Sequence, residues 1–122
     1  MTREARTLGS FLREHREALR EDDSSYSLRQ VAERVGIQPS YLSQVERDVA
    51  PSLPAEETLV RLAHELELDP DLVLAMAGKV SSDLREVILQ RPQLFAELLR
   101  DLRTLPDHAL MRLVREVRDG DW

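Results

Sequence analysis

One stretch near the middle of the chain carries polar side chains at helical spacing. Four residues stand at positions i, i+3, i+4 and i+7, and a helix would place them on one face: Ser40, Ser43, Gln44 and Arg47. They offer hydroxyl, amide and guanidinium groups with a single formal charge, and they contain no nucleophile paired with a base. The spacing therefore predicts a hydrogen-bonding recognition surface.

Residue types that carry catalysis or bind metals are sparse and scattered. The chain has no cysteine, and His15, His64 and His108 are far apart and lack metal-ligand spacing. His15 lies on the apolar stripe of a predicted helix, where a packed histidine is the expected interpretation. No glycine-rich phosphate loop is present. We assign no catalytic residue, no metal ligand and no cofactor, and the sequence does not predict an enzyme.

Composition favours a small, helix-rich folded protein and argues against membranes and phosphate groups as partners. Of 122 residues, 42% are hydrophobic and 33% charged. There is no signal-peptide core at the start and no apolar run of the roughly 20 residues that cross a bilayer, so we expect a cytoplasmic protein without a membrane partner. The net charge of -6 opposes binding to phosphates, which basic residues usually neutralise. Residues 1–78 carry this acidic excess, whereas residues 79–122 are balanced.

Apolar periodicity predicts five helices in the first 78 residues, at about residues 7–20, 28–35, 39–47, 54–66 and 70–77. Ser27 is a predicted N-cap, Gly36 ends the second helix, and Pro39 suits the first turn of the third. The acidic run at residues 21–26 is expected to be an exposed loop. Gly78 closes the fifth helix and marks a boundary between domains at residues 1–78 and 79–122.

The segment LRQVAERVGIQPSYLSQVER, residues 28–47, resembles the helix-turn-helix of the Cro/cI-repressor (XRE) family. The resemblance rests on a small residue at the helix crossing, a glycine in the turn and five inward aliphatic residues: Ala32, Gly36, Val31, Val35, Ile37, Leu42 and Val45. Residues 60–78 are similar to the family's fourth and fifth helices. The family implies an all-α fold, with a five-helix Cro/cI-type DNA-binding domain followed by a small helical C-terminal region.

This resemblance implies a transcription regulator, most simply a repressor, that binds a pseudo-palindromic operator in double-stranded DNA as a homodimer. With the third helix in the major groove, five residues are predicted to read base edges: Gln38, Pro39, Ser40, Ser43 and Gln44. The amide of Gln44 suits an adenine. Phosphate contacts are expected from Ser27, Arg29, Arg34 and Arg47, with free amides at a helix N-terminus adding to them.

Residues 79–122 predict three more amphipathic helices, at about residues 81–90, 92–105 and 106–119. So short a region buries too little surface to fold alone, and we expect it to form the dimer. The interface candidates are Leu98, Leu99, Leu102, Leu110, Leu113 and Val114. In the alternative interpretation these helices cover the DNA-binding domain of the same chain.

Two features depart from the family pattern. The connection between the first two helices is longer and acidic, and Asp48 stands where the family commonly has glycine.

Proteins of this layout resemble phage-type repressors, autoregulatory antitoxins and DdrO-like stress repressors whose C-terminal helices are cut by a partner metallopeptidase. The sequence leaves these settings open. The alternative from a different functional class is a protein-interaction module that does not bind DNA and whose acidic surface binds a basic partner protein.

Overall fold

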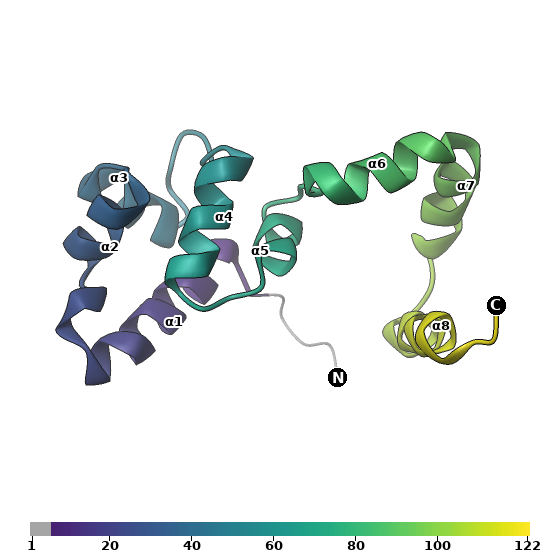
Figure 1. Ribbon diagram of the computed structural model, residues 1–122, viewed down its shortest axis with the longest axis horizontal. Helices are drawn as coiled ribbons and strands as arrows, with labels where there is room; N and C mark the ends of the chain where they lie inside the picture. Colours follow the sequence, from purple (N-terminus) through teal and green to yellow (C-terminus); the bar gives the residue numbers. More distant parts are fainter. Residues whose placement is uncertain (1–5) are drawn as a thin grey trace. The chain divides into compact units, whose positions relative to one another are not determined.

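The computed structural model describes residues 6–122, and these form eight α-helices and one 3-10 turn, without a strand (Figure 1). The chain divides between Ser81 and Ser82 into two compact units, which are described separately. The first unit contains α1 (Leu8–Asp22), η1 (Ser24–Tyr26), α2 (Leu28–Val35), α3 (Pro39–Glu46), α4 (Glu56–Glu65) and α5 (Pro70–Met76). The second contains α6 (Ser82–Gln90), α7 (Pro92–Leu102) and α8 (Asp107–Asp119). In the described part of the chain, no helix is both long and apolar enough to span a membrane.

The first unit has an aliphatic core to which all five of its α-helices contribute. Its buried apolar residues are Leu8, Leu12, Val31, Ala32, Val35, Leu42, Val45, Leu59, Leu62, Ala63, Leu66, Val73 and Leu74. They recur every three or four residues along each helix, which is the spacing that predicted these helices. His15 is half-buried, as expected, with its ring 4.4 Å from that of Phe11.

Capping residues fix where the helices of the first unit begin and end. The Ser27 hydroxyl accepts the amide of Gln30, as predicted, and Asp69 caps α5 through the amide of Asp71. Gly36 ends α2 with a φ of 87°, a conformation that a Cβ would disfavour. Pro39 occupies the first turn of α3, where no intrahelical donor is required.

The acidic run at residues 21–26 is exposed over residues 21–24, as expected, but it is not a loop. Helix α1 continues to Asp22, and Ser24–Tyr26 form the 3-10 turn η1. The Asp23 carboxylate caps this turn, and Tyr26 packs partly buried against the core. Like charges in the sequence predicted a solvated loop, whereas a cap and the packing of one aromatic side chain support a regular turn here.

The second unit consists of three helices without a buried residue among residues 82–122. Helix α7 ends at Leu102, earlier than the predicted Leu105. Pro106 accounts for the non-helical state of Leu105, because a proline disfavours helical conformation in the residue before it. Pro106 then serves as the N-cap residue of α8.

Candidate nucleic-acid interface

Helices α2 and α3 pack closely because small and aliphatic residues line their crossing. Ala32 and Val35 are fully buried on α2, and Leu42 and Val45 are buried on α3. The turn between the helices is closed by the amides of Gly36 and Ile37, which both donate to the carbonyl of Ala32. This rigid pair leaves the outer face of α3 available for contacts.

The outer face of α3 carries the polar residues that the sequence placed there. Ser40 and Arg47 are exposed, and Ser43 and Gln44 are half-buried. The Nε of Arg47 lies 3.3 Å from both the hydroxyl and the carbonyl oxygen of Ser43, so these two side chains hold each other in position. Gln38 is the N-cap residue but makes no capping bond. Within residues 6–122, no hydrogen bond occupies the side chain of Ser40 or Gln44.

A buried ion pair fixes α3 against α1. The Nε of Arg16 lies 2.7 Å from one carboxylate oxygen of Glu46 and its Nη2 lies 3.0 Å from the other, while only 3% and 5% of the two residues are exposed. The hydrogen bond to Glu46 raises the pKa of Arg16, and burial opposes this rise. Arg16 also donates to the carbonyl of Tyr26, 3.2 Å away. Helix α3 is therefore positioned by charge-assisted bonds as well as by the core.

A hollow of about 270 Å³ lies between α1 and α3, beside the start of α2. Eight residues line it: Arg13, Arg16, Glu17, Arg20, Leu28, Ser43, Glu46 and Arg47. Four arginines against two glutamates give this hollow a positive formal charge within an otherwise acidic unit. The sequence analysis did not predict a site role for Arg13 and Arg20. The sequence does not show which helix the arginine-bearing face of α1 lies against. The spacing of seven residues between Arg13 and Arg20 places them on the same helix face and is the signal that could have found them.

Arg34, one of the expected phosphate contacts, is bonded to two other elements of the first unit. Its Nε lies 2.7 Å from a carboxylate oxygen of Glu65, and its Nη1 lies 2.8 Å from the carbonyl oxygen of Ser25. Its guanidinium also lies 5.4 Å from the ring centre of Tyr26. These bonds join α2 to α4 and η1. Arg29, by contrast, is exposed near the start of α2.

The loop after α3 is tied to the start of α1 by Asp48. Its φ is 60°, a left-handed conformation that is uncommon for residues other than glycine. The carboxylate accepts bonds from the hydroxyl of Thr7 at 2.6 Å and the amide of Gly9 at 3.0 Å. A Cβ on Gly9 would lie 2.5 Å from the carbonyl oxygen of Val45, so the close approach of α1 to α3 needs glycine at this position.

Comparison with known proteins identifies this part of the chain. The family model described as helix-turn-helix matches residues 17–73. Residues 17–73 belong to the helix-turn-helix family. This match confirms the family predicted from residues 28–47, and the helix-turn-helix family is one of DNA-binding domains, not of enzymes.

The chain is similar to two curated proteins, each named as an uncharacterized HTH-type transcriptional regulator. Both come from Mycobacterium tuberculosis, strains CDC 1551 / Oshkosh and H37Rv. Each is 34% identical over 85 residues, covering 66% of this chain and 56% of the relative. The chain therefore aligns with just over half the length of these relatives. Among solved structures, a SinR protein/SinI protein complex is similar with a TM-score of 0.47 and 20% identity, covering 88% of this chain and 99% of that chain.

Proposed function

We propose that this protein regulates transcription by binding double-stranded DNA, and that it acts as a repressor on a pseudo-palindromic operator. One observation carries the proposal: on the polar outer face of α3 the side chains of Ser40 and Gln44 make no hydrogen bond within residues 6–122, and this face adjoins a hollow lined by arginines. A helix held in this way can lie in the major groove with its first turns against base edges. Such a role places the protein in the cytoplasm with its DNA.

Base recognition rests on the first two turns of α3. Gln44 is the proposed reader of adenine, because its amide can donate to and accept from that base at once. Ser40 and Ser43 supply hydroxyls for neighbouring base pairs, and Gln38 and Pro39 lie at the tip of the helix. The bond between Arg47 and Ser43 limits the rotation of Ser43, so its contact is set before DNA arrives.

Phosphate recognition requires a revised set of residues. Arg13, Arg20 and Arg47 line the hollow, and we propose that each of them contacts a DNA phosphate beside it. Arg29 and the amides at the start of α2, next to Ser27, supply a second contact. Arg34 leaves the set because its donors already bond to Glu65 and Ser25.

Dimerisation through the second unit would place two such surfaces on one operator. Six apolar residues of α7 and α8 are the proposed interface: Leu98, Leu99, Leu102, Leu110, Leu113 and Val114. Four of them are exposed in the single chain, and Leu102 and Leu110 are half-buried. A repressor of this kind blocks transcription by occupying its operator, which needs only tight dimeric binding.

Selection of binding sites from random duplex DNA tests this function with the full chain. We expect recovered sequences with two inverted half-sites about 10 base pairs apart, or a multiple of this distance. Enrichment of single, unpaired sites would contradict the dimer, and no enrichment at all would contradict DNA recognition.

The revised phosphate set has its own test in the salt dependence of binding to a selected site. Arg13→Ala should reduce the slope of log K against log salt by about two, one phosphate contact for each subunit. Arg61→Ala is the matched control, since Arg61 is an exposed arginine on α4 outside the hollow. Equal slopes for the two variants would remove the hollow from the DNA interface.

A further inference from the structure

We propose that α7 and α8 fold only when they associate with a second copy of this chain, so that dimer formation and helix formation are one concentration-dependent step. The inference deepens the proposed function and rests on it, because a two-fold operator needs two joined copies. It concerns the second unit alone, and it assigns one occupant to an apolar groove in that unit.

The second unit lacks the interior that would hold it together. Residues 82–122 contain no buried side chain, whereas the first unit buries a contiguous aliphatic core. Large apolar side chains stay accessible along all three helices, with exposed fractions of 62% for Leu89, 63% for Leu94 and 62% for Met111. A unit of about 40 residues usually needs a disulfide, a metal or a partner to be stable. The chain has no cysteine, and a partner would supply the missing burial.

The helices are also too short to persist by themselves. Helices α6, α7 and α8 have 9, 11 and 13 residues. Isolated helices below about 12 to 15 residues are marginal in water. Neither Arg91 nor Pro106, the N-cap residues of α7 and α8, makes a side-chain capping bond. Packing against a partner is therefore needed to keep these helices folded.

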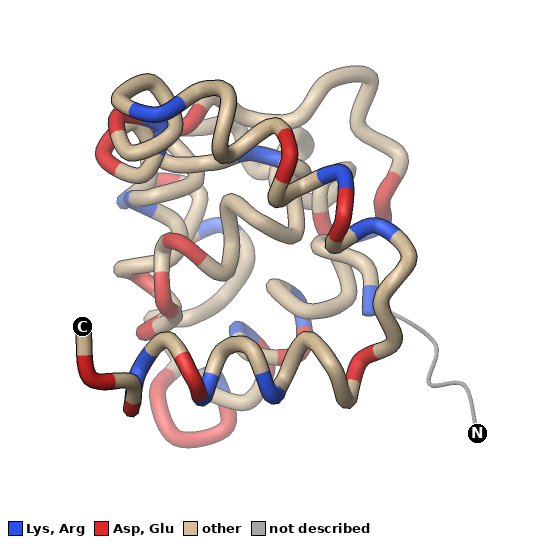
Figure 2. The backbone as a smooth tube through the Cα atoms, turned by 90° about the vertical axis from the view of Figure 1, so that its right-hand side faces the viewer, with Lys and Arg blue, Asp and Glu red and all other residues tan. Residues whose placement is uncertain are grey.

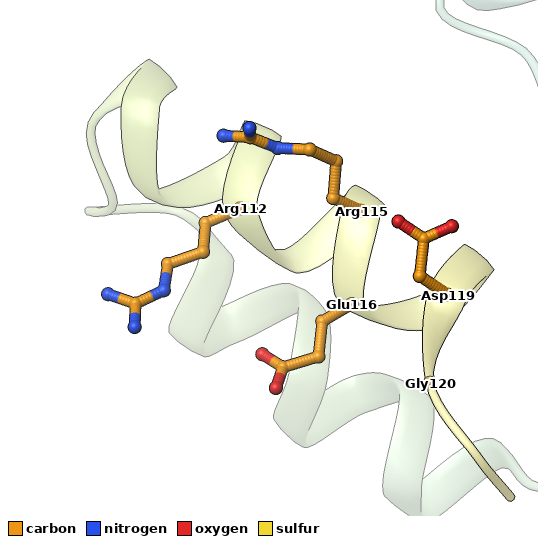
Figure 3. Close-up of a pocket in the computed structure, with 5 residues that line it drawn as sticks. All are labelled: Arg112, Arg115, Glu116, Asp119 and Gly120. Atoms are coloured by element: carbon orange, nitrogen blue, oxygen red, sulfur yellow. The ribbon is translucent and has the colours of Figure 1, made fainter.

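A groove between α7 and α8 shows where the partner packs. It has a volume of about 360 Å³ and is lined by Leu98, Leu102, Leu110, Leu113, Val114 and Val117, with Arg118 at its edge. The α8 members recur at i, i+3, i+4 and i+7, which is one continuous stripe. The opposite face of α8 carries Arg112, Arg115, Glu116 and Asp119, whose side chains project from successive turns (Figure 3). Helix α8 thus has one apolar face for a partner and one charged face for solvent.

Charge and symmetry favour a second copy as this partner. Residues 82–122 contain seven arginines and eight acidic residues, and both signs are interspersed along the helices (Figure 2). This balance offers no net attraction to nucleic acid or to an anionic lipid surface. Two copies of this unit therefore meet with little like-charge repulsion, unlike two copies of the acidic first unit. A second copy brings the same stripe at the same spacing, so two grooves can fill each other in a two-fold interface.

Hydrogen exchange of the full chain, measured by mass spectrometry above and below the dissociation concentration found by sedimentation, tests the coupling. We expect amides of α7 and α8 to be protected in the dimer and to exchange like an unfolded peptide in the monomer. Amides of α2 and α3 should be protected in both, because their core is complete within one chain. A monomer with protected α7 and α8 would overturn the coupling and leave the proposed DNA binding intact.

Two matched variants test the occupant. Leu113→Glu places a charge in the groove, whereas Met111→Glu places the same charge on the same helix outside the lining residues. We expect Leu113→Glu to be monomeric with unprotected α7 and α8 but still to bind a single half-site, and Met111→Glu to dimerise. A Leu113→Glu protein that dimerises, or a parent chain that stays monomeric at every concentration while binding DNA, would overturn the second copy as occupant. If the unsubstituted chain does not bind even a single half-site, the result would instead count against the proposed function.

Discussion

The buried ion pair between α1 and α3 gives a prediction of defined size. Arg16→Met removes the cation, leaving the Glu46 carboxylate without a partner in a site that is 5% exposed and the Tyr26 carbonyl without its donor. Removing one member of a buried pair costs about 3 to 5 kcal/mol. The whole free energy of unfolding of a domain is about 5 to 15 kcal/mol. Arg16→Met should therefore lower the melting temperature of the first unit by well over 10 °C, at about 4 to 8 °C for each kcal/mol.

The double variant Arg16→Met/Glu46→Met separates loss of a pair from loss of packing. Because both charges are then replaced by apolar chains, we expect most of the lost stability to return. Urea unfolding followed by tyrosine fluorescence measures the first unit selectively, since Tyr26 and Tyr41 are both in it and the tryptophan is not. Arg13→Met, an exposed arginine on the same helix, is the control, with an expected change within about 0.5 kcal/mol. A single variant that costs less than about 1 kcal/mol, or a double variant as unstable as the single one, would refute this account of the pair.

Four further changes have expected outcomes. Gln44→Ala should weaken operator binding by about 1 to 3 kcal/mol and relax specificity at one base pair, as read by competition with single-base operator variants. Arg34→Ala should leave the salt slope of DNA binding unchanged and lower stability by about 0 to 1 kcal/mol, because its ion pair is partly exposed. Gly9→Ala should destabilise the first unit by about 1 to 3 kcal/mol in thermal unfolding, since its Cβ would overlap the backbone after α3. Hydrogen bonds from Ser25 lower the pKa of Asp23, so the stabilising contribution of this cap is present at neutral pH and lost as pH falls through the folded pKa; an NMR titration should show Ser25→Ala shifting that pKa upward.

The sequence predicted the helix-turn-helix well because its signals are local. Apolar spacing, the Ser27 cap, the Gly36 turn and the Pro39 start each act within one or two helical turns, and the structure shows all of them. The all-α class and the family follow from the same short segment. Local chemistry of this kind can be deduced without knowing how distant helices pack.

Contacts between residues that are far apart in the sequence could not be predicted from the sequence. Arg34 and Glu65 are 31 residues apart, and only the packing of α2 against α4 brings them together. Arg13 and Arg20 resembled solvated helix arginines until the position of α3 was known. The carboxylate of Asp48 accepts a hydrogen bond from the amide of Gly9, 39 residues earlier in the chain, which the sequence pattern did not indicate. Ion-pair partners and loop anchors therefore depend on tertiary structure in a way that helix boundaries do not.

The net charge of -6 opposes binding to phosphates, so DNA binding is the property to measure directly. Labelled duplex from the region upstream of the protein's own gene should be titrated with the full chain at about 50 mM and about 200 mM salt. We predict binding at the lower concentration and a loss of affinity of tenfold or more at the higher one, because phosphate contacts from Arg13, Arg20, Arg29 and Arg47 release counterions. Absence of binding at low salt, to this duplex and to random-sequence duplex alike, would contradict the account.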